Sequence, residues 1–368
     1  MGPVKKEVPT ATWMEWKKEK NIRKAKKRDK ILAKIDQHQQ EQSESASSSA
    51  ATAEKSGPAE ERKGRNWTVS IALPGNILDN AQTPELRSYL AGQIARAVAI
   101  FNVDEVVVFN EQGSLEDLKG GNDEEMVEEL PRACLQLSRI LQYLECPQYL
   151  RKYFFPMHKD LSHAGLLNPL DAPNHYRRED KAKYREGYVT EKVKKGVYSM
   201  VDVGLQRPIP VDTLLSPGLR VTVEISGDES GEIKKMRGMI VPPSTPVKQD
   251  GIYWGYSVRC ANSLGAVFTQ CPYEEGYDLL VGTSERGDEL PKSLPSYKHI
   301  LIAFGGLRGL ELGLESDKSL KVEDPSLLFD FYLNTCPSQG SRTIRTEEAL
   351  LVTLASLQPL LSKANNYS

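Results

Sequence analysis

The sequence has 368 residues, with 48 lysines and arginines against 50 aspartates and glutamates, a formal net charge of -2 and a mean hydropathy of -0.46. This length gives room for two folded domains and a tail. No apolar run approaches the ~20 residues of a membrane helix, and the lysine-rich beginning lacks the apolar core of a signal peptide, so we expect neither a membrane protein nor a secreted one. The five cysteines include no C-x-x-C pair, which argues against a disulfide framework or a zinc site and indicates a reducing compartment.

Residues 1–65 are predicted to form a basic arm that is disordered in isolation. Lysine and arginine dominate between Lys5 and Lys34, and the stretch from His38 to Ala53 is mainly serine, alanine and glutamine. The rest of the chain must then be net acidic. A basic arm on an acidic body is typical of nucleic-acid attachment or nuclear import, with a solvated flexible tail as the alternative.

A parallel sheet is predicted for the next part of the chain. Residues 67–73 form a predicted buried strand, and the following helix begins with Thr83 as its capping residue and Pro84 in its first turn, and runs toward Phe101. Residues 104–109 form a second strand, residues 112–129 a polar loop and residues 132–144 a second helix. The order strand, helix, strand, helix predicts an α/β domain.

A small β-barrel is predicted to interrupt this domain. Five candidate strands follow one another without a helical segment, and turns rich in glycine and proline separate most of them. The strands are residues 187–190, 197–203, 219–225, 235–241 and 253–259. Tyr253, Trp254 and Tyr256 in the last strand offer surfaces for stacking on unpaired bases, with core packing as the alternative.

The α/β pattern resumes at Leu264 with three transitions from strand to turn. Predicted strands at residues 277–281, 299–304 and 327–333 run into turns at residues 282–287, 305–309 and 334–348. Glycine lets backbone groups approach a ligand that a Cβ atom would block, and open α/β sheets hold ligands at the carboxyl ends of their strands. We therefore expect the three turns to converge on one small molecule. Leucines cover more than one face of the helix predicted over residues 349–361, so part of it is expected to pack against another subunit.

Six segments carry a resemblance to a known family. They are ALPGNILDNA at residues 72–81, YLAGQIARA at 89–97, LQYLECPQYLRK at 141–152, GLLNPL at 165–170, GTSERG at 282–287 and NTCPSQGSRTIRTEE at 334–348. The chain resembles the eukaryotic and archaeal branch of the SPOUT-class RNA methyltransferases, which carries an inserted OB-like domain. The resemblance implies an α/β trefoil-knot methyltransferase domain made of residues 66–170 and 262–368, and an OB-like β-barrel at residues 171–261.

The resemblance also implies S-adenosyl-L-methionine as cofactor, held largely by backbone groups. The cofactor loops of the family fall on three parts of this chain. Their residues are Thr283, Ser284, Glu285, Arg286, Gly287, Gly305, Gly306, Leu307, Asn334, Thr335, Cys336, Pro337, Gln339, Gly340, Ser341, Ile344 and Arg345.

Arg96 is the predicted catalytic residue on the substrate side. The segment GQIAR at residues 92–96 resembles the glycine-to-arginine motif of ribose-methylating relatives, and an ion pair on the helix surface is the alternative. Arg286 and Arg345 are candidates for phosphate contacts or for pairs with neighbouring glutamates. The asparagine-glycine spacing of ribose methyltransferases is missing, so a base nitrogen such as uridine N3 and the ribose 2′-oxygen both stay open.

The implied function is methylation of RNA, rRNA in the first place, by a homodimer in the nucleus or nucleolus. Removal of a proton from a uridine N3 or a hydroxyl would accompany such a transfer. The alternative is a non-catalytic RNA-binding scaffold associated with the mitotic spindle or kinetochore, which the basic arm and the barrel would serve.

Overall fold

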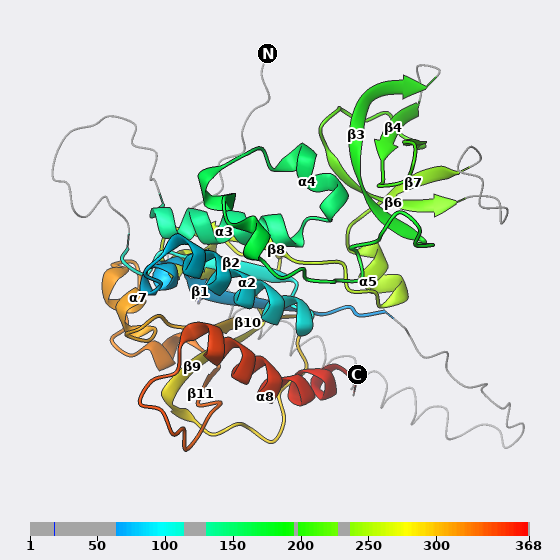
Figure 1. Ribbon diagram of the computed structural model, residues 1–368. Helices are drawn as coiled ribbons and strands as arrows, with labels where there is room; N and C mark the ends of the chain where they lie inside the picture. The colour runs from blue at the N-terminus through cyan, green and yellow to red at the C-terminus, as the bar shows by residue number, and fades with distance from the viewer. Residues whose placement is uncertain (1–17, 19–63, 114–129, 195–197, 227–235, 367–368) are drawn as a thin grey trace, which may run out of the picture.

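The computed structural model describes Lys18 and residues 64–113, 130–194, 198–226 and 236–366 (Figure 1). Apart from Lys18, Gly64 and Arg65, the predicted basic arm lies outside the described residues, as does most of the loop predicted over residues 112–129. None of the described helices is long and apolar enough to cross a membrane.

A six-stranded parallel sheet forms the centre of the larger domain and confirms the predicted α/β class. The strand order is β11-β9-β10-β1-β2-β8, and every neighbouring pair is parallel. The strands are β1 (Thr68–Pro74), β2 (Glu105–Phe109), β8 (Ser257–Ala261), β9 (Leu279–Asp288), β10 (His299–Ala303) and β11 (Phe331–Leu333).

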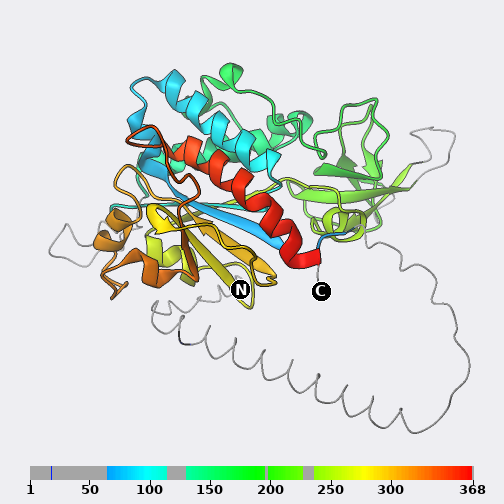
Figure 2. The same ribbon diagram turned by 90° about the horizontal axis from the view of Figure 1, so that it is seen from below.

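Helices cover both faces of this sheet. On one face, α2 (Pro84–Ile100), α3 (Arg132–Glu145) and α8 (Thr346–Asn366) share a core with alternate residues of β1. On the other, α6 (Leu264–Thr269) and α7 (Glu311–Ser316) pack against Ala72 and its neighbours. Side chains alternate across a strand, so a strand buried on both faces reads as a continuous apolar run, as β1 and β10 do. Figure 2 shows α8, in red, beside α2, in cyan, on the same face of the sheet.

The start of α2 follows the predicted capping. Thr83 lies in extended conformation and its hydroxyl accepts a hydrogen bond from the Leu86 backbone N–H, while Pro84 occupies the first helical position. The short helix η1 (Gly75–Asn80) connects β1 to this cap. Three short elements follow α3, namely α4 (Gln148–Phe154) and the single turns η3 (Lys159–Leu161) and η4 (Ala164–Leu166).

A separate antiparallel sheet interrupts the larger domain, at the upper right in Figure 1. Its order is β5-β4-β3-β6-β7, and it buries its own valine-rich core. The strands are β3 (Tyr184–Lys194), β4 (Tyr198–Asp202), β5 (Ile209–Pro210), β6 (Arg220–Ser226) and β7 (Arg237–Val241), followed by α5 (Thr245–Asp250). The first four predicted barrel strands are confirmed here, and the two-residue β5 was missed.

The fifth predicted barrel strand was wrong. The strand at this point is β8, displaced toward Ala261, and it pairs with β2 at the edge of the parallel sheet. Tyr253, Trp254 and Tyr256 are all buried before it, and the hydroxyls of both tyrosines donate to carbonyls of the larger domain, those of Val103 and Leu141. The core-packing alternative therefore holds for the three aromatic side chains.

The predicted end of the arm at residue 65 also needs correction. The Arg65 guanidinium pairs with Asp104 and lies 4.8 Å from the Trp67 ring centroid, and the Arg65 N–H donates to the Val247 carbonyl at 2.9 Å. Asp104 in turn accepts from the Val69 backbone N–H at 2.8 Å, which orients the first residues of β1. Arg65 belongs to the folded body because its charge partners a carboxylate that is nearly buried.

We expect Arg65→Ala to destabilise the protein by about 3 kcal/mol, because it leaves a buried carboxylate without its cation. Burial raises the pKa of Asp104 to about 6 from its ordinary value of 3.8. Because this pKa is raised, folded Asp104 keeps its proton between pH 3.8 and about 6, where the unfolded chain loses it. Ionisation of Asp104 therefore lowers the free energy of unfolding as pH rises through this range. Loss of Arg65 raises the pKa further and extends the range to higher pH.

The measurement is chemical denaturation of the wild type and of Arg65→Ala at pH 5 and pH 8. The loss of unfolding free energy in Arg65→Ala should be larger at pH 8, where wild-type Asp104 is ionised. Arg87→Ala, which removes an exposed pair with Asp79, is the matched control and should cost less than about 1 kcal/mol. Equal losses at the two pH values would contradict the assignment.

Candidate functional site

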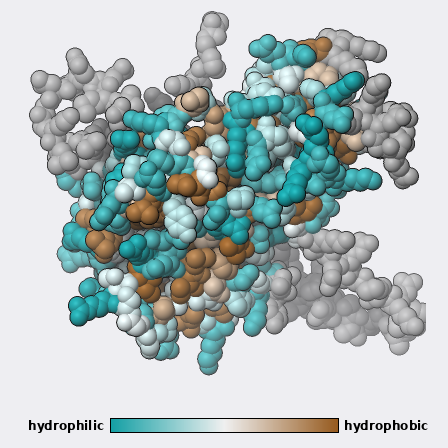
Figure 3. All heavy atoms as spheres, in the orientation of Figure 1, coloured by the Kyte–Doolittle hydropathy of each residue, from teal (hydrophilic) through white to brown (hydrophobic). Residues whose placement is uncertain are grey.

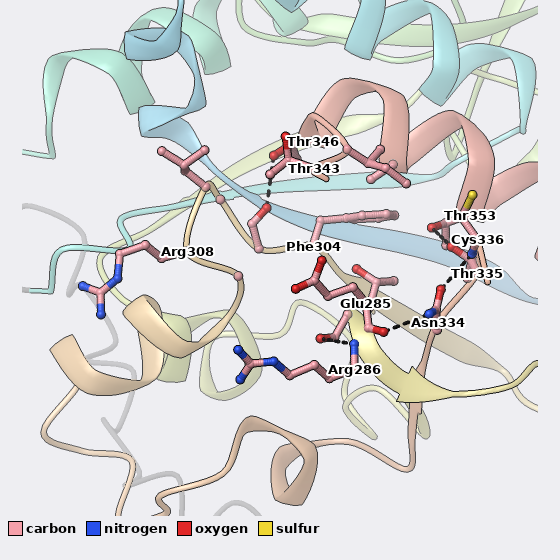
Figure 4. A pocket seen from close by; sticks show the side chains of 18 of the residues that line it. Glu285, Arg286, Phe304, Arg308, Asn334, Thr335, Cys336, Thr343, Thr346 and Thr353 are labelled. Carbon is pink, nitrogen blue, oxygen red and sulfur yellow. Dashed lines mark hydrogen bonds between the residues drawn. The ribbon is translucent and has the colours of Figure 1, made fainter. Parts of the chain in front are cut away.

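A cavity of about 530 Å³ opens at the carboxyl ends of β9, β10 and β11, beside the beginning of α8 (Figure 4). Most of the predicted cofactor residues line it. They are Thr283, Ser284, Glu285, Arg286, Gly305, Gly306, Leu307, Asn334, Thr335, Cys336, Gln339 and Ile344. The remaining predicted positions do not line it, namely Gly287, Pro337, Gly340, Ser341 and Arg345.

The cavity adjoins the point where the sheet reverses its direction of winding. After β1 the chain continues into α2 on one face, whereas after β10 it continues into α7 on the other, although β1 and β10 are neighbours. Connections that leave adjacent strand ends toward opposite faces open a crevice outside those ends, and open α/β sheets bind ligands there.

The first predicted glycine turn was wrong, because β9 continues through it to Asp288. A Cβ atom on Gly282 would lie 2.5 Å from a Phe329 ring carbon, and one on Gly287 would lie 2.4 Å from the Leu333 carbonyl carbon. These two glycines therefore let β9 pack closely against the chain around β11. The side chains between them still reach the cavity from the exposed end of the strand.

The second predicted turn is confirmed after β10. The Gly309 N–H donates to the Gly306 carbonyl at 3.0 Å, and Gly309 has a φ of 73°, a conformation that favours glycine. A Cβ atom on Gly305 would lie 2.2 Å from the Gly309 carbonyl carbon. From α8, the Thr346 hydroxyl donates to the Gly305 carbonyl at 3.1 Å. The turn is thus tight and held by α8.

The third predicted turn, after β11, is stabilised by its own polar side chains. The Asn334 side-chain amide donates to the Glu285 carbonyl at 2.8 Å and its oxygen accepts from the Cys336 N–H at 3.0 Å. The Thr335 and Thr353 hydroxyls lie 2.8 Å apart, as Figure 4 shows. Because these polar side chains already have partners within the protein, other backbone groups and apolar surfaces are left to contact a ligand.

Twelve further lining residues were not named as cofactor positions, although Arg308, Gly309, Arg342, Thr343 and Thr346 lie within the predicted turns. The twelve are Phe304, Arg308, Gly309, Glu311, Glu315, Leu333, Arg342, Thr343, Thr346, Ala349, Val352 and Thr353. The contribution of α8 carried a usable signal, because Thr353 interrupts the leucine-rich part of the helix two turns after Thr346, its first residue. Among the described residues, no group of three or more His, Cys, Asp or Glu side chains could hold a metal ion.

Arg96 lies apart from the cavity lining. Its guanidinium donates to the backbone carbonyls of Pro169 and Leu170, and among the described residues it makes no ion pair. The catalytic role of Arg96 stays a prediction. Arg345 Nη1 lies 3.9 Å from Glu347 Oε1, which agrees with the alternative that Arg345 pairs with a neighbouring glutamate.

The geometry agrees with comparisons to known proteins. Residues 68–357 match the model of a family described as "Putative RNA methyltransferase". The chain belongs to this family. The 28S rRNA (uridine-N(3))-methyltransferase of Mus musculus is 54% identical over 307 residues, 83% of this chain and 79% of that protein. The proteins of the same name from Homo sapiens and Drosophila melanogaster are 53% and 47% identical, and cover 84% and 96% of this chain and 83% and 74% of their own lengths. The predicted resemblance to RNA methyltransferases is confirmed.

We expect Gly287→Ala to destabilise this RNA methyltransferase by about 2 kcal/mol, because the new methyl group would force β9 and β11 apart. Gly340→Ala is the matched control, since a Cβ atom there would have no neighbour within 4 Å. Chemical denaturation measures both. A Gly287→Ala protein as stable as Gly340→Ala would contradict the packing role.

Proposed function

We propose that the protein transfers a methyl group from S-adenosyl-L-methionine to rRNA, at uridine N3. The observation that carries the proposal is the cavity at the ends of β9, β10 and β11, in a chain of this family. Relatives more than half identical to it are named for methylation of 28S rRNA at uridine N3. This favours the base nitrogen over the ribose 2′-oxygen and an enzyme over a scaffold.

The residues of the cavity suit this cofactor. A volume of about 530 Å³ lies within the range of small-molecule sites. The glycine turn after β10 and the loop after β11 would hold the cofactor through backbone groups, and Phe304, Ile344 and Val352 supply apolar surface. When bound, S-adenosyl-L-methionine supplies an activated methyl group on a sulfonium.

The mouth of the cavity would position the RNA. Three exposed arginines, Arg286, Arg308 and Arg342, come from three different segments that line it. Guanidinium groups bind phosphate oxygens, and such contacts fix the register of a nucleic acid. Methyl transfer is an in-line displacement whose leaving group departs neutral, so the main task of these side chains is alignment of the uridine.

The inserted sheet is proposed to be an OB-like barrel, and the larger domain a trefoil-knot methyltransferase domain. Support for closure of the barrel comes from the bridge between Val211 and Gly238, which brings the segment after β5 to β7. The contact of Thr346 with Gly305 supports a close passage of α8 past the turn after β10. A crystal structure in which the chain around the cavity is not threaded would rule out the knot.

We propose that the protein is a homodimer. Leu350, Leu354, Leu357 and Leu361 are buried within the subunit, whereas Leu351 on the same helix remains 41% exposed. Exposed apolar side chains also occur on α2, and Figure 3 shows brown patches in the middle and lower part of the face on which Figure 1 draws α2 and α8. Light scattering should report a dimer at micromolar concentration, and a strict monomer would contradict it.

The basic arm is proposed to add affinity for RNA and to direct the protein to the nucleus or nucleolus, because its charge excess suits phosphate binding and nuclear import. A separate association with the spindle or kinetochore is the second proposal for the same arm. Imaging of the tagged full chain and of a chain lacking residues 1–63 tests both. Unchanged distribution after the deletion would rule out a targeting role.

Calorimetry and nucleotide mass spectrometry test the enzyme proposal. The protein should bind S-adenosylhomocysteine saturably and form N3-methyluridine in rRNA from cells that lack it. Arg96→Ala should retain the ligand affinity but lose at least about 10²-fold in turnover if Arg96 acts on the substrate.

Lys298→Ala, at an exposed pair with Glu275, is the matched control and should leave both properties unchanged. A wild-type protein that binds no S-adenosyl compound would sink the proposal. If Arg96→Ala loses stability but keeps its turnover, the role of Arg96 is structural and consists of its hydrogen bonds to the Pro169 and Leu170 carbonyls.

A further inference from the structure

A buried carboxylate lies behind the glycine turn that follows β10. Glu111 comes shortly after β2 and is only 3% exposed. Its Oε1 accepts a hydrogen bond from the side-chain amide of Asn76, which lies in η1 directly after β1. Since β1 pairs with β2 on one side and with β10 on the other, three neighbouring strand ends bring Asn76, Glu111 and the turn together.

Glu111 packs directly against Gly306. A Cβ atom on Gly306 would lie 2.5 Å from Glu111 Oε2 and 2.9 Å from Oε1, so the turn can approach the carboxylate only because residue 306 has no side chain. Oε2 is buried and has no hydrogen-bond partner of good geometry among the described residues, and neither has Asn76 Oδ1. Burial of a carboxylate oxygen without a hydrogen-bond partner destabilises the fold, which points to a functional role for Glu111.

The charges around Glu111 favour its ionised form against burial. Burial raises the pKa of Glu111, while the Asn76 amide, the Gly306 backbone N–H and the Arg308 guanidinium lower it. Arg308 also lies 3.1 Å from Glu315 of α7. On the side of α3, Cys134 is neutral, because burial raises the pKa of its thiol to about 12. Burial is the largest of these effects, so the pKa of Glu111 stays above its ordinary value, and the Asn76 amide remains its side-chain hydrogen-bond donor.

We infer that Glu111 is a positioning residue whose carboxylate, with Asn76, holds Gly306 and so fixes the wall of the cofactor cavity. The inference rests on the proposed function and concerns the same cavity. Glu111 itself is enclosed and does not line the cavity. The Thr346 hydroxyl of α8 donates to the Gly305 carbonyl, and the Glu111 carboxylate, two residues after β2, packs against Gly306. The two contacts fix consecutive residues of a turn that must present its backbone to the cofactor.

Glu111→Gln in the full chain tests the inference, with Glu275→Gln as the matched control at an exposed pair with Lys298. The glutamine keeps the shape of the side chain but places an amide N–H₂ against two donors. Amide hydrogen exchange over residues 305–310 should become about tenfold faster, and the Kd for S-adenosylhomocysteine about tenfold weaker. Glu275→Gln should change neither.

The pH profile separates the role of the charge from that of the shape. Wild-type affinity should fall as pH is lowered from 8 to 5.5, because protonation of Glu111 removes an acceptor from Gly306, and this fall should be missing in Glu111→Gln. Gly306→Ala gives a second test, since its methyl group should weaken the Kd less in a Glu111→Ala background than in the wild type.

Additive effects of Gly306→Ala and Glu111→Ala, or wild-type exchange rates and affinity in Glu111→Gln, would overturn the inference. If the wild-type protein binds no S-adenosyl compound, the proposed function fails, but the exchange rates of residues 305–310 still decide whether Glu111 holds the turn.

Discussion

The pairing of β10 with β1 is the constraint on which the site depends. Thr68 pairs with His299 and Ala72 with Ala303, so the contact joins two segments that the whole antiparallel sheet separates in sequence. The central residues of β10 are fully buried, and parallel strands of this kind need helices on both faces. Because β10 leads directly into the glycine turn, the wall of the cavity forms only when this long-range pairing has formed. The site therefore depends on the global fold and not on a locally stable loop.

The inserted sheet is joined to the larger domain by a second buried interaction. Arg220 of β6 donates two hydrogen bonds to Glu145 at the end of α3, at 2.7 and 2.9 Å, and one to Glu186 of β3 at 2.8 Å. Burial raises the pKa of Glu145, and the charge of Arg220 opposes that rise. The Trp254 indole and the Thr222 hydroxyl complete the set of donors to Glu186. A satisfied network of this kind contributes more to a defined geometry than to stability, so it fixes the insert against α3.

The order of elements could be read from the sequence, but several pairings could not. Helical spacing and the Thr83 cap located α2, and apolar runs located β1, β2 and β10. The segment around residue 257 was placed in the wrong sheet, because an apolar extended run predicts a strand but not the strand with which it pairs. The turn predicted between Gly282 and Gly287 was wrong for a related reason, because glycine is typical both of a turn and of a close approach of two backbone segments. Only the packing against Phe329 and the backbone of Leu333 distinguishes these two cases.

The site shows the same division between local and distant signals. Residues contributed by the turn at residues 305–309 and the loop after β11 were found, because glycine and small polar residues there directly follow strands. Glu111 and the α8 lining were missed, because each contacts a turn that lies far away in the sequence. Asn334, Thr335 and Thr346 use their polar atoms within the protein, so these side chains define the shape of the cavity. The absence of a Cβ atom at Gly305 and Gly306 lets the turn pack against Gly309 and Glu111, so the shape of this wall depends on the elements behind the turn.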